Sequence, residues 1–368
     1  MNENYVTLGQ VCDKGSSNIA QKDLAEREGW YPIYGAAGLI KNVDFAHQKQ
    51  PYIAVVKDGA GIGRVMKLPA YSSVIGTMQY ILPKKNVDID YLFYALQHMN
   101  LGKYFSGSTI PHIYFRDYQK ERLKLPAMKV QQHQAEVLGR IDALSSDGRK
   151  QIDLLDELVK SRFIEMFKGG RYPIVKAADV CDFITKGTTP PSNEIYSKPF
   201  EDSIPYLKVY NLSFDGSMLF FEEPQYISRD THEGKLARSK IYPNDVLMNI
   251  VGPPLGKFSL VNNDFPEWNI NQAIAIFRAR ESILPKFLLH ALMQPDVLKP
   301  FLDKAQGVRQ LNFSLEQCRN LEFPLPPIPE QQEFVEFVEQ ANKSKLAVKQ
   351  SFEKLETLKK SLMQQYFG

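Results

Sequence analysis

The chain has 368 residues, of which 43% are hydrophobic, 24% charged and 11% aromatic, a composition typical of globular proteins with two or three domains. No apolar run approaches the roughly 18 residues of a transmembrane helix, and the first residues lack the basic and then apolar run of a signal peptide. The three cysteines, Cys12, Cys181 and Cys318, do not make a disulfide framework or a cysteine metal site. These features predict a cytoplasmic protein.

The formal net charge of +3 is unevenly distributed along the chain. Residues 1–130 contain 16 Lys and Arg against 11 Asp and Glu, whereas the remaining segments are close to neutral. Their counts are 6 against 7 in residues 131–169, 17 against 18 in residues 170–329 and 6 against 6 in residues 330–368. A protein that binds nucleic acid usually has a basic surface, so the charge permits this function without proving it.

Residues 1–130 predict a globular domain of mixed α/β class. Short β-like runs, such as residues 52–56 (Tyr-Ile-Ala-Val-Val), are separated by Gly, Pro and Asn turns. Residues 58–64 (Asp-Gly-Ala-Gly-Ile-Gly-Arg) have the glycines of a nucleotide-binding loop but lack the G-x-G-x-x-G spacing. A tight turn between two strands is the better interpretation of this segment.

Residues 131–169 carry the pattern of a long helix. Apolar residues recur at spacings of three and four, which predicts a single apolar stripe on one helix face. The stripe comprises Ile152, Leu155, Val159, Phe163 and Met166. Pro126 precedes the helix and Gly169 follows it, as expected for helix boundaries. Residues 145–148 (Ser-Ser-Asp-Gly) are expected to weaken or interrupt the helix near its middle.

The second half of the chain repeats these features after about 200 residues, which indicates a domain duplication. Residues 170–329 predict a second mixed α/β domain, and residues 330–368 predict a second long helix. The apolar stripe of the second helix comprises Val348, Phe352, Leu355, Leu358, Leu362 and Tyr366. The matched landmarks are Cys12 with Cys181, Arg64 with Lys257, Ala95 with Ala291, Gly107 with Gly307, Pro126 with Pro324, residues 131–132 with 331–332, and Phe167 with Phe367.

Two similar amphipathic helices in one chain most simply bury their stripes against each other. If the copies are related by a pseudo-two-fold axis, the helices form an antiparallel coiled coil. The residues expected to pair the helices are Ile152, Leu155, Val159, Phe163, Phe352, Leu355, Leu358 and Leu362. In the alternative arrangement, each helix packs on its own globular segment.

No catalytic motif is recognisable in the sequence. Residues 251–258 (Val-Gly-Pro-Pro-Leu-Gly-Lys-Phe) are one residue short of a phosphate-binding P-loop and have Phe258 in place of the magnesium-binding hydroxyl. The six histidines lack the spacing of metal ligands, and Cys12 and Cys181 lie beside apolar residues and are expected in the core. The chain is therefore not expected to be an enzyme or to hold a metal or cofactor.

The order of these segments resembles the specificity subunit of Type I restriction-modification enzymes, over nearly the whole chain. Residues 186–190 (Lys-Gly-Thr-Thr-Pro), followed by residues 203–212 (Ser-Ile-Pro-Tyr-Leu-Lys-Val-Tyr-Asn-Leu), are similar to the family's Gly-x-Thr-Pro loop and Ile-Pro-aromatic strand. Residues 30–38 (Trp-Tyr-Pro-Ile-Tyr-Gly-Ala-Ala-Gly), together with 58–64, resemble the other common variant of this module. Both copies end in the family's Pro and Gln-Gln junction.

The resemblance implies that each globular segment is a target-recognition domain for one half of an asymmetric, bipartite site in double-stranded DNA. The paired helices, each of roughly 35 residues and about 50 Å, are implied to set the distance between the half-sites. They are also implied to dock two modification subunits, which carry S-adenosylmethionine and the methyl-transfer chemistry. Restriction subunits that use ATP and Mg are implied to join that core.

Candidate DNA contacts follow from residue chemistry. Arg, Lys and Asn commonly read base edges, and Ser, Thr and Lys commonly hold phosphates. The candidates are Lys14, Ser16, Ser17, Lys57 and Arg64 in the first segment, and Lys186, Thr188, Thr189, Lys208, Asn211, Lys257 and Arg309 in the second. The alternative for each is a solvated surface side chain.

Three other functions remain open at this point. The chain could be an enzyme with an unrecognised active site, which predicts catalysis by the purified chain alone. It could be a scaffold whose two globular parts bind proteins, which predicts no salt-dependent DNA binding. It could also recognise DNA within a Type IIB-like or methylation-only assembly.

Overall fold

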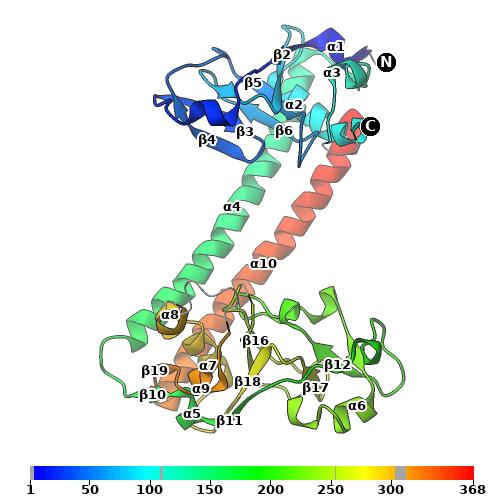
Figure 1. Cartoon of the computed structure of the whole chain (residues 1–368). Helices are drawn as coiled ribbons and strands as arrows, with labels where there is room; N and C mark the ends of the chain where they lie inside the picture. Colours follow the sequence, from blue (N-terminus) through cyan, green and yellow to red (C-terminus); the bar gives the residue numbers. More distant parts are fainter. Residues whose placement is uncertain (1–3, 108–110, 253, 303–311) are drawn as a thin grey trace. The chain divides into compact units, whose positions relative to one another are not determined.

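The computed structural model describes residues 4–107, 111–252, 254–302 and 312–368 (Figure 1). The chain forms two compact units. Unit 1 comprises residues 1–150 and 348–368, and unit 2 comprises residues 151–347. Each unit contains a globular part, here called the first head (residues 4–127) and the second head (residues 171–327). Each also contains segments of two 40-residue helices, α4 (Met128–Phe167) and α10 (Ile328–Phe367).

The first head begins and ends with short strands that pair with each other. It contains, in chain order, β1 (Tyr5–Thr7), α1 (Leu8–Val11), β2 (Cys12–Ser16), β3 (Tyr31–Gly35), β4 (Gly38–Val43), β5 (Tyr52–Val56), β6 (Val65–Leu68), β7 (Ser73–Val74), β8 (Met78–Pro83), α2 (Ile89–His98), α3 (Phe115–Tyr118) and β9 (Arg122–Lys124).

The second head has the same plan. It contains β10 (Ile174–Lys176), α5 (Ala177–Val180), β11 (Cys181–Lys186), β12 (Ile204–Leu207), β13 (Tyr226–Ile227), α6 (Arg229–Glu233), β14 (Lys240–Ile241), β15 (Val246–Asn249), β16 (Phe258–Leu260), β17 (Trp268–Ile270), β18 (Ile274–Ala279), α7 (Pro285–Leu292), α8 (Pro295–Leu302), α9 (Leu315–Arg319) and β19 (Glu322–Pro324).

A four-stranded antiparallel sheet lies at the centre of the first head, with strand order β2-β8-β5-β6. All five residues of β5 are buried, because both faces of the sheet are covered. Ile53 and Val55 belong to a cluster that includes α2, whereas Tyr52, Ala54 and Val56 belong to a second cluster that includes Val74 of β7. The strand predicted for residues 52–56 is therefore confirmed, and its alternation assigns each side chain to one of two cores.

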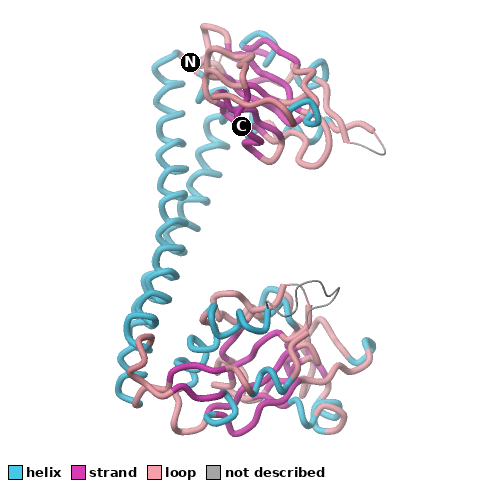
Figure 2. Tube along the Cα trace, turned by 60° about the vertical axis from the view of Figure 1, so that its left-hand side comes forward, coloured by secondary structure: helices cyan, strands magenta, loops and turns pink. Residues whose placement is uncertain are grey.

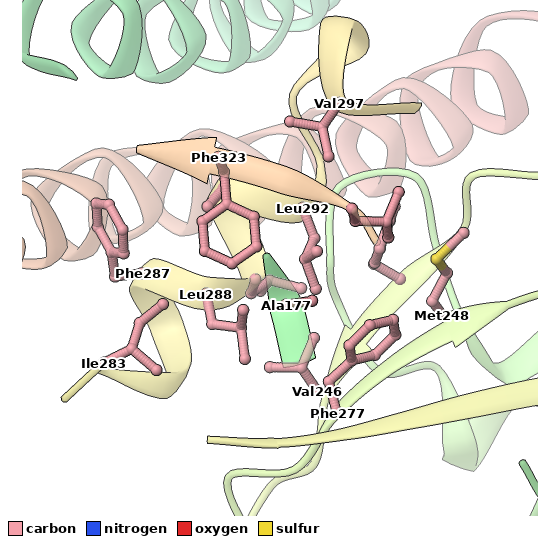
Figure 3. Close-up of a cluster of buried hydrophobic side chains, with 14 of the residues drawn as sticks. Ala177, Val246, Met248, Phe277, Ile283, Phe287, Leu288, Leu292, Val297 and Phe323 are labelled. Atoms are coloured by element: carbon pink, nitrogen blue, oxygen red, sulfur yellow. The ribbon is translucent and has the colours of Figure 1, made fainter. Parts of the chain in front are cut away.

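The second head repeats this sheet with the strand order β11-β18-β15-β16. Its strands are visible in Figure 2 as magenta segments. On one face, Val246, Met248 and Phe277 pack with Phe287 and Leu288 of α7 (Figure 3). On the other face, a cluster contains residues of β15 and β18 together with residues of the smaller sheet β13-β12-β17-β14. Both heads also contain one parallel strand pair, β3 with β7 and β12 with β17.

The strands and helices of the two heads confirm three of the matched landmarks. Cys12 and Cys181 begin the equivalent strands β2 and β11. The carbonyl of Arg64 accepts a hydrogen bond from Val56 N–H at 2.9 Å, and the carbonyl of Lys257 accepts one from Asn249 N–H at 3.0 Å. Because Val56 and Asn249 end the equivalent strands β5 and β15, Arg64 and Lys257 occupy equivalent positions. Ala95 and Ala291 likewise lie at matching places on α2 and α7.

One landmark was matched incorrectly from the sequence. Val6 pairs with Leu123 in the first head, and Val175 pairs with Phe323 in the second. Since these strand pairs are equivalent, Leu123 corresponds to Phe323, and Pro126 corresponds to Pro326 rather than to Pro324. The proline-rich run before α10 made the shift of two residues invisible in the sequence.

A buried glutamine ties the start of α4 to the first head. Gln131 is only 1% exposed. Its side-chain Oε1 accepts a hydrogen bond at 2.8 Å from the N–H of Asp88, the residue that caps α2. Its Nε2 donates to the carbonyl oxygens of Pro126 at 2.8 Å and Asn86 at 3.3 Å. One carboxamide therefore joins three backbone groups from two segments of the head.

The second head contains the same arrangement around Gln331, which is fully buried. Its Oε1 accepts a hydrogen bond at 2.8 Å from the N–H of Leu284, the residue before α7. Its Nε2 donates to Pro326 at 2.8 Å and to Ser282 at 3.2 Å. The Gln-Gln landmark seen in both copies of the sequence thus has a common structural role at its first glutamine.

The helix α4 runs without interruption through residues 145–148, so the expected break is wrong. Ser145 is 6% exposed and is therefore buried against neighbouring residues. A Cβ atom on Gly148 would lie 3.4 Å from Cγ1 of Val348, which shows that α10 approaches this glycine closely. Packing against α10 offsets the weak helix propensity of this segment, which is about 1 kcal/mol for a glycine.

Segments of α4 and α10 contact each other within each unit. In unit 1, Asp142 forms an ion pair with Lys359, and the Arg149 guanidinium lies 4.8 Å from the centre of the Phe352 ring. The later α4 residue, Arg149, contacts the earlier α10 residue, Phe352, so the two segments run antiparallel.

The helix segments of unit 2 show the same direction. There, Asp156 forms an ion pair with Lys345, and Arg162 contacts Glu333 at 3.0 Å. Phe163 is fully buried and packs edge-on against Phe334 at a centroid distance of 5.4 Å. These segments of α4 and α10 are therefore also antiparallel.

The helix-pairing residues differ in how deeply they are buried. Val159 and Phe163 lie in the core of unit 2, and Leu362 packs against the core of unit 1. Four others are partly buried, namely Ile152, Leu155, Phe352 and Leu355. Leu358 is 47% exposed, so its expected role in pairing is wrong. The apolar spacing placed it near the stripe, but the partner segment does not cover it.

Replacing Gln131 with Leu is expected to destabilise unit 1. The substitution leaves the Asp88 N–H without its acceptor, which costs about 1–3 kcal/mol. Hydrogen exchange of the full chain should show faster exchange at the start of α2, together with a lower unfolding midpoint. Gln132→Leu, at the exposed neighbouring position, is the matched control and should change neither quantity. Unchanged protection in Gln131→Leu would show that the clamp is dispensable.

Replacing Leu362 with Asp is expected to loosen the packing of α10 in unit 1. An unpaired carboxylate would enter the apolar cluster, at a cost of several kcal/mol. Leu358→Asp places the same charge on the same helix at an exposed site and should be tolerated. Thermal unfolding followed by circular dichroism compares the two variants, and equal midpoints would contradict this placement of the helix.

Candidate DNA interface

Three predicted DNA contacts of the first head lie along one edge of its central sheet. In this antiparallel sheet, the end of β2 at Ser16, the end of β5 before Lys57 and the start of β6 after Arg64 share that edge. The start of β8 is beside them, since the Lys57 N–H donates to the Thr77 carbonyl at 3.0 Å. The topology thus brings together residues that are far apart in the sequence. We call this group the first edge.

Residues 58–64 form the turn between β5 and β6, as the sequence predicted. Gly63 has a φ of 79°, and a Cβ atom there would lie 2.3 Å from the backbone nitrogen of Gly102. Only glycine fits this close approach. Arg64 follows directly, is exposed, and donates a hydrogen bond from Nη1 to the Ala36 carbonyl at 2.9 Å. The guanidinium is therefore held in place at the surface.

A row of charged and aromatic groups beside the first edge was missed in the sequence. His112 contacts the carboxylate of Asp58, which also lies 3.6 Å from Lys57 Nζ. The Tyr114 ring lies 4.0 Å from the His112 ring, and the Arg116 guanidinium lies 4.5 Å from Tyr114. Burial, and secondarily Lys57, lowers the pKa of His112. The His-x-Tyr-x-Arg alternation of residues 112–116 was the available signal for this row.

The second head has an equivalent edge, which we call the second edge. Lys186 ends β11 as Ser16 ends β2, and Lys257 occupies the position of Arg64. Thr189 Oγ1 accepts a hydrogen bond from the Gln272 N–H at 3.2 Å, which places the loop after β11 beside the start of β18.

The loop after β11 also approaches other backbone at this edge. A Cβ atom on Gly187 would lie 2.1 Å from the Asn271 carbonyl oxygen, so this position requires glycine. Thr188, next along the loop, is partly buried. Lys208 follows β12, whose last residue, Leu207, accepts a hydrogen bond from the Asn271 N–H at 3.0 Å. Four of the predicted contact residues are thus gathered around Asn271, namely Lys186, Thr188, Thr189 and Lys208.

An exposed aromatic residue accompanies Lys257. The Lys257 ammonium lies 5.9 Å from the centre of the Phe214 ring, and Phe214 is 58% exposed. The loop that carries Phe214 is fixed by the hydroxyl of Ser213, which donates to the Ser217 carbonyl at 2.9 Å. Sequence reasoning missed Phe214, because a single Phe between polar residues has no distinctive pattern.

Two of the predicted contact residues are buried, and their assignment to DNA is corrected. Ser17 is 5% exposed, and its hydroxyl accepts a hydrogen bond from the Ile19 N–H at 3.3 Å. Asn211 is fully buried, and its Oδ1 accepts a hydrogen bond from the Lys208 N–H at 2.8 Å. Each side chain holds a local turn. Lys14 is exposed within β2, away from the strand end, and Arg309 lies outside the described residues.

The cysteines expected in the core are found there. Cys12 and Cys181 are 1% and 2% exposed. Burial raises the pKa of both thiols to about 12, so both are protonated at neutral pH. This agrees with their prediction as small core residues.

Among the described residues, one group has the side chains and spacing to hold a metal ion, namely His232, Glu233 and Glu267. Its carboxylates are already paired with cations, since Glu267 contacts Arg229 at 2.7 Å and Glu233 contacts Lys240. Both ring nitrogens of His232 also have partners, Asn269 at 3.0 Å and Glu267 at 3.2 Å. The arrangement is that of an ion-pair network rather than of an open metal site.

No helix within the described part of the chain combines the length and the apolar character needed to cross a membrane.

The family model for the Type I restriction modification DNA specificity domain matches the chain twice, at residues 2–154 and 171–360. The specificity subunit of the Type I restriction enzyme MjaVIII from Methanocaldococcus jannaschii is 21% identical over 367 residues, covering 92% of this chain and 85% of that protein. The EcoBI specificity subunit from Escherichia coli is 25% identical over 268 residues, covering 64% of this chain and 54% of that protein.

Solved structures of the same kind share the fold. The S subunit of a Type I restriction-modification system from M. genitalium aligns with a TM-score of 0.61 at 16% identity, covering 100% of this chain and 97% of that one. A chain from a structure that describes assembly and conformational transition of a type I R-M system aligns with a TM-score of 0.56 at 16% identity, covering 100% of this chain and 98% of that chain.

The two matches of the family model cover most of the chain and coincide with the two copies of the sheet and its edge. The chain therefore belongs to the Type I restriction-modification specificity family, and it is a DNA sequence-specificity subunit rather than a catalytic one.

Proposed function

We propose that each head reads one half of an asymmetric, bipartite sequence in double-stranded DNA, through the first edge and the second edge. The observation that carries this proposal is that one framework is built twice with different side chains. Ser16 in the first edge stands where Lys186 stands in the second, and Arg64 stands where Lys257 stands. Because different side chains occupy equivalent backbone positions in the two heads, the two heads are suited to reading different DNA sequences.

The residue chemistry supports this assignment. Arg64 is exposed and hydrogen-bonded to backbone, so its remaining guanidinium donors are held ready for a base edge or a phosphate. Thr188 and Thr189 lie on a loop beside Lys186, a combination common at phosphate contacts. The glycines at positions 63 and 187 let the loops adopt fixed shapes, which reduces the entropy lost on binding.

We further propose that α4 and α10 pair as an antiparallel coiled coil that relates the two heads by a pseudo-two-fold axis. The antiparallel contacts found within each unit support this pairing. Two 40-residue helices of about 60 Å each would then set the half-site spacing and dock two modification subunits. S-adenosylmethionine would be bound by those subunits, and ATP and Mg by restriction subunits, in a cytoplasmic complex.

The domain boundaries that follow from this proposal are those expected from the sequence. Residues 1–130 and 170–329 would be the target-recognition domains, and residues 131–169 and 330–368 the helical spacers. The compact units divide each helix between them, so each head would be fastened to the ends of both spacers.

Replacing Arg64 with Ala is expected to relax or weaken recognition of one half-site only, because a lost bidentate base contact costs about 1–3 kcal/mol at one position. Lys257→Ala should act on the other half-site, and the two effects should add because the heads make separate contacts. Methylation mapping in cells that carry the cognate modification subunit measures both. Lys67→Ala, in the same hairpin but paired with Asp90, is the control that should leave both half-sites unchanged.

Two other results of this experiment would change the account. If Arg64 touches only phosphate, Arg64→Ala should weaken binding to all sequences equally and lower the salt slope by about one. If one substitution alters both half-sites, the heads do not act as independent readers.

The chain is expected to depend on its modification subunit for methyl-transfer activity. Alone, it should neither bind S-adenosylmethionine nor transfer methyl groups, whereas a complex with its modification subunit should methylate adenine at a single bipartite sequence. Methyl transfer from labelled S-adenosylmethionine to DNA, measured with and without that subunit, checks this. Methylation by the chain alone would contradict the proposal.

A further inference from the structure

Residues 112–116, which lead into α3, present alternate side chains to solvent beside the first edge. His112 is partly buried and Tyr114 and Arg116 are exposed. The intervening residues, Ile113 and Phe115, are buried in the core cluster that also contains α2. Since the two buried side chains fix the orientation of this segment, the other three face outward together. We call His112, Tyr114 and Arg116 the outer row.

Backbone hydrogen bonds attach the beginning of the outer row to the first edge. The Ile113 N–H donates to the carbonyl of Lys57 at 2.9 Å, and Lys57 belongs to the first edge. On the other side of the segment, His112 exchanges backbone hydrogen bonds of 2.8 and 3.0 Å with Ser106. The row therefore starts from backbone that is paired on both sides.

Side-chain contacts continue from there to Arg116. The Nδ1 atom of His112 pairs with the carboxylate of Asp58. The Tyr114 ring lies 4.0 Å from the His112 ring, and the Arg116 guanidinium lies 4.5 Å from the centre of the Tyr114 ring. A guanidinium that stacks on an aromatic face keeps the N–H groups at its edge available for paired hydrogen bonds. Arg116 is thus oriented at the surface before any partner binds.

The second head keeps this backbone arrangement but carries different side chains on it. There, the Phe313 N–H donates to the Ile250 carbonyl at 2.8 Å, so Phe313 is the counterpart of Ile113. The counterparts of the outer row, in chain order, are Asn312, Ser314 and Glu316. At these described positions, the first head has two aromatic rings and a guanidinium, whereas the second has two small polar groups and a carboxylate.

The charges around the outer row are balanced, which affects what the row can bind. Asp58 lies 3.6 Å from Lys57 Nζ, and the Asp117 carboxylate lies 3.7 Å from Arg116 Nε. Burial, and secondarily Lys57, lowers the pKa of His112, so its ring is neutral at physiological pH. An acid beside Arg116 opposes the approach of a phosphate, but not that of the uncharged edge of a base. The row is therefore suited to reading a base rather than to attracting DNA in general.

We propose that Arg116, positioned by the Tyr114 ring, reads a guanine in the half-site bound by the first head. Its guanidinium donates paired hydrogen bonds to O6 and N7 of that base, which is the most common specific contact in the major groove. The assignment rests on the proposed function of the first head and adds a specificity-determining residue to it. Because Glu316 occupies the equivalent position, the second head reads its own half-site without this contact.

The test uses the full chain in complex with its cognate modification subunit. Methylation rates are measured on the mapped target and on duplexes in which each base pair is changed in turn. The ratio of the two rates is the discrimination at that position. We expect Arg116→Ala to lower the discrimination about tenfold or more at one G·C pair, in the half-site that Arg64→Ala also alters. Every other position should keep the discrimination of the original chain.

Two substitutions of Tyr114 test its positioning role. Tyr114→Ala removes the ring beneath the guanidinium and should lower the discrimination at the same G·C pair as Arg116→Ala does. Tyr114→Phe keeps the ring and should restore the original value. Arg122→Ala is the matched control, since Arg122 lies 5.1 Å from the centre of the Tyr5 ring on β9, outside the central sheet. It should change the discrimination at no position.

The possible results separate this assignment from the proposed function. Unchanged discrimination in Arg116→Ala, while Arg64→Ala alters a half-site, would overturn the assignment alone. An equal loss of rate on every duplex would place Arg116 on a phosphate and would also overturn it. If neither Arg64→Ala nor Lys257→Ala alters a half-site, the proposed function itself is contradicted.

Discussion

The fold depends on one hydrogen-bonded carboxamide that is built twice. Gln131 and Gln331 lie in the first turn of the long helices, where backbone N–H groups and carbonyls of the head would otherwise be buried without partners. Each side chain joins the helix, the proline segment before it and the start of α2 or α7. A rigid helix can transmit a fixed direction only if its first turn is fixed, and these glutamines supply that constraint within each unit.

The two heads share the backbone framework of the central sheet, and they differ in the side chains at positions that this framework does not constrain. The strand order of the central sheet, its buried strands and the positive-φ glycines at Gly63 and Gly256 are shared, whereas the side chains along the two edges are not. Arg64 has a planar guanidinium that can form paired hydrogen bonds, and its counterpart Lys257 is a point charge. A change of sequence preference can therefore occur at the edge without altering the core that positions it.

The sequence predicted those features that arise from local pattern. A short β-like apolar run between turn residues predicted the strand at residues 52–56, three- and four-residue spacing predicted both helices, and repeated landmarks predicted the duplication. It could not predict the continuity of α4 through Gly148, because that depends on the approach of α10. The exposure of Leu358 likewise depends on the path of the distant helix α4, and the burial of Asn211 depends on the turn that its side chain joins to Lys208, Leu219 and Glu223. Residue type alone made Asn211 a candidate for DNA contact, whereas its three-dimensional setting makes it the centre of a turn.

The central claim, that each head contacts its own half-site, is tested most directly by cross-linking. Arg64→Cys and Lys257→Cys chains, assembled with the modification subunit, are offered target DNA with a thiol tether on one half-site. The native cysteines should not react with the tether, since Cys12, Cys181 and Cys318 are at most 2% exposed and burial raises the pKa of each thiol to about 12. The account predicts that each variant forms a disulfide with a different half-site. Cross-linking of both variants to the same half-site would contradict it.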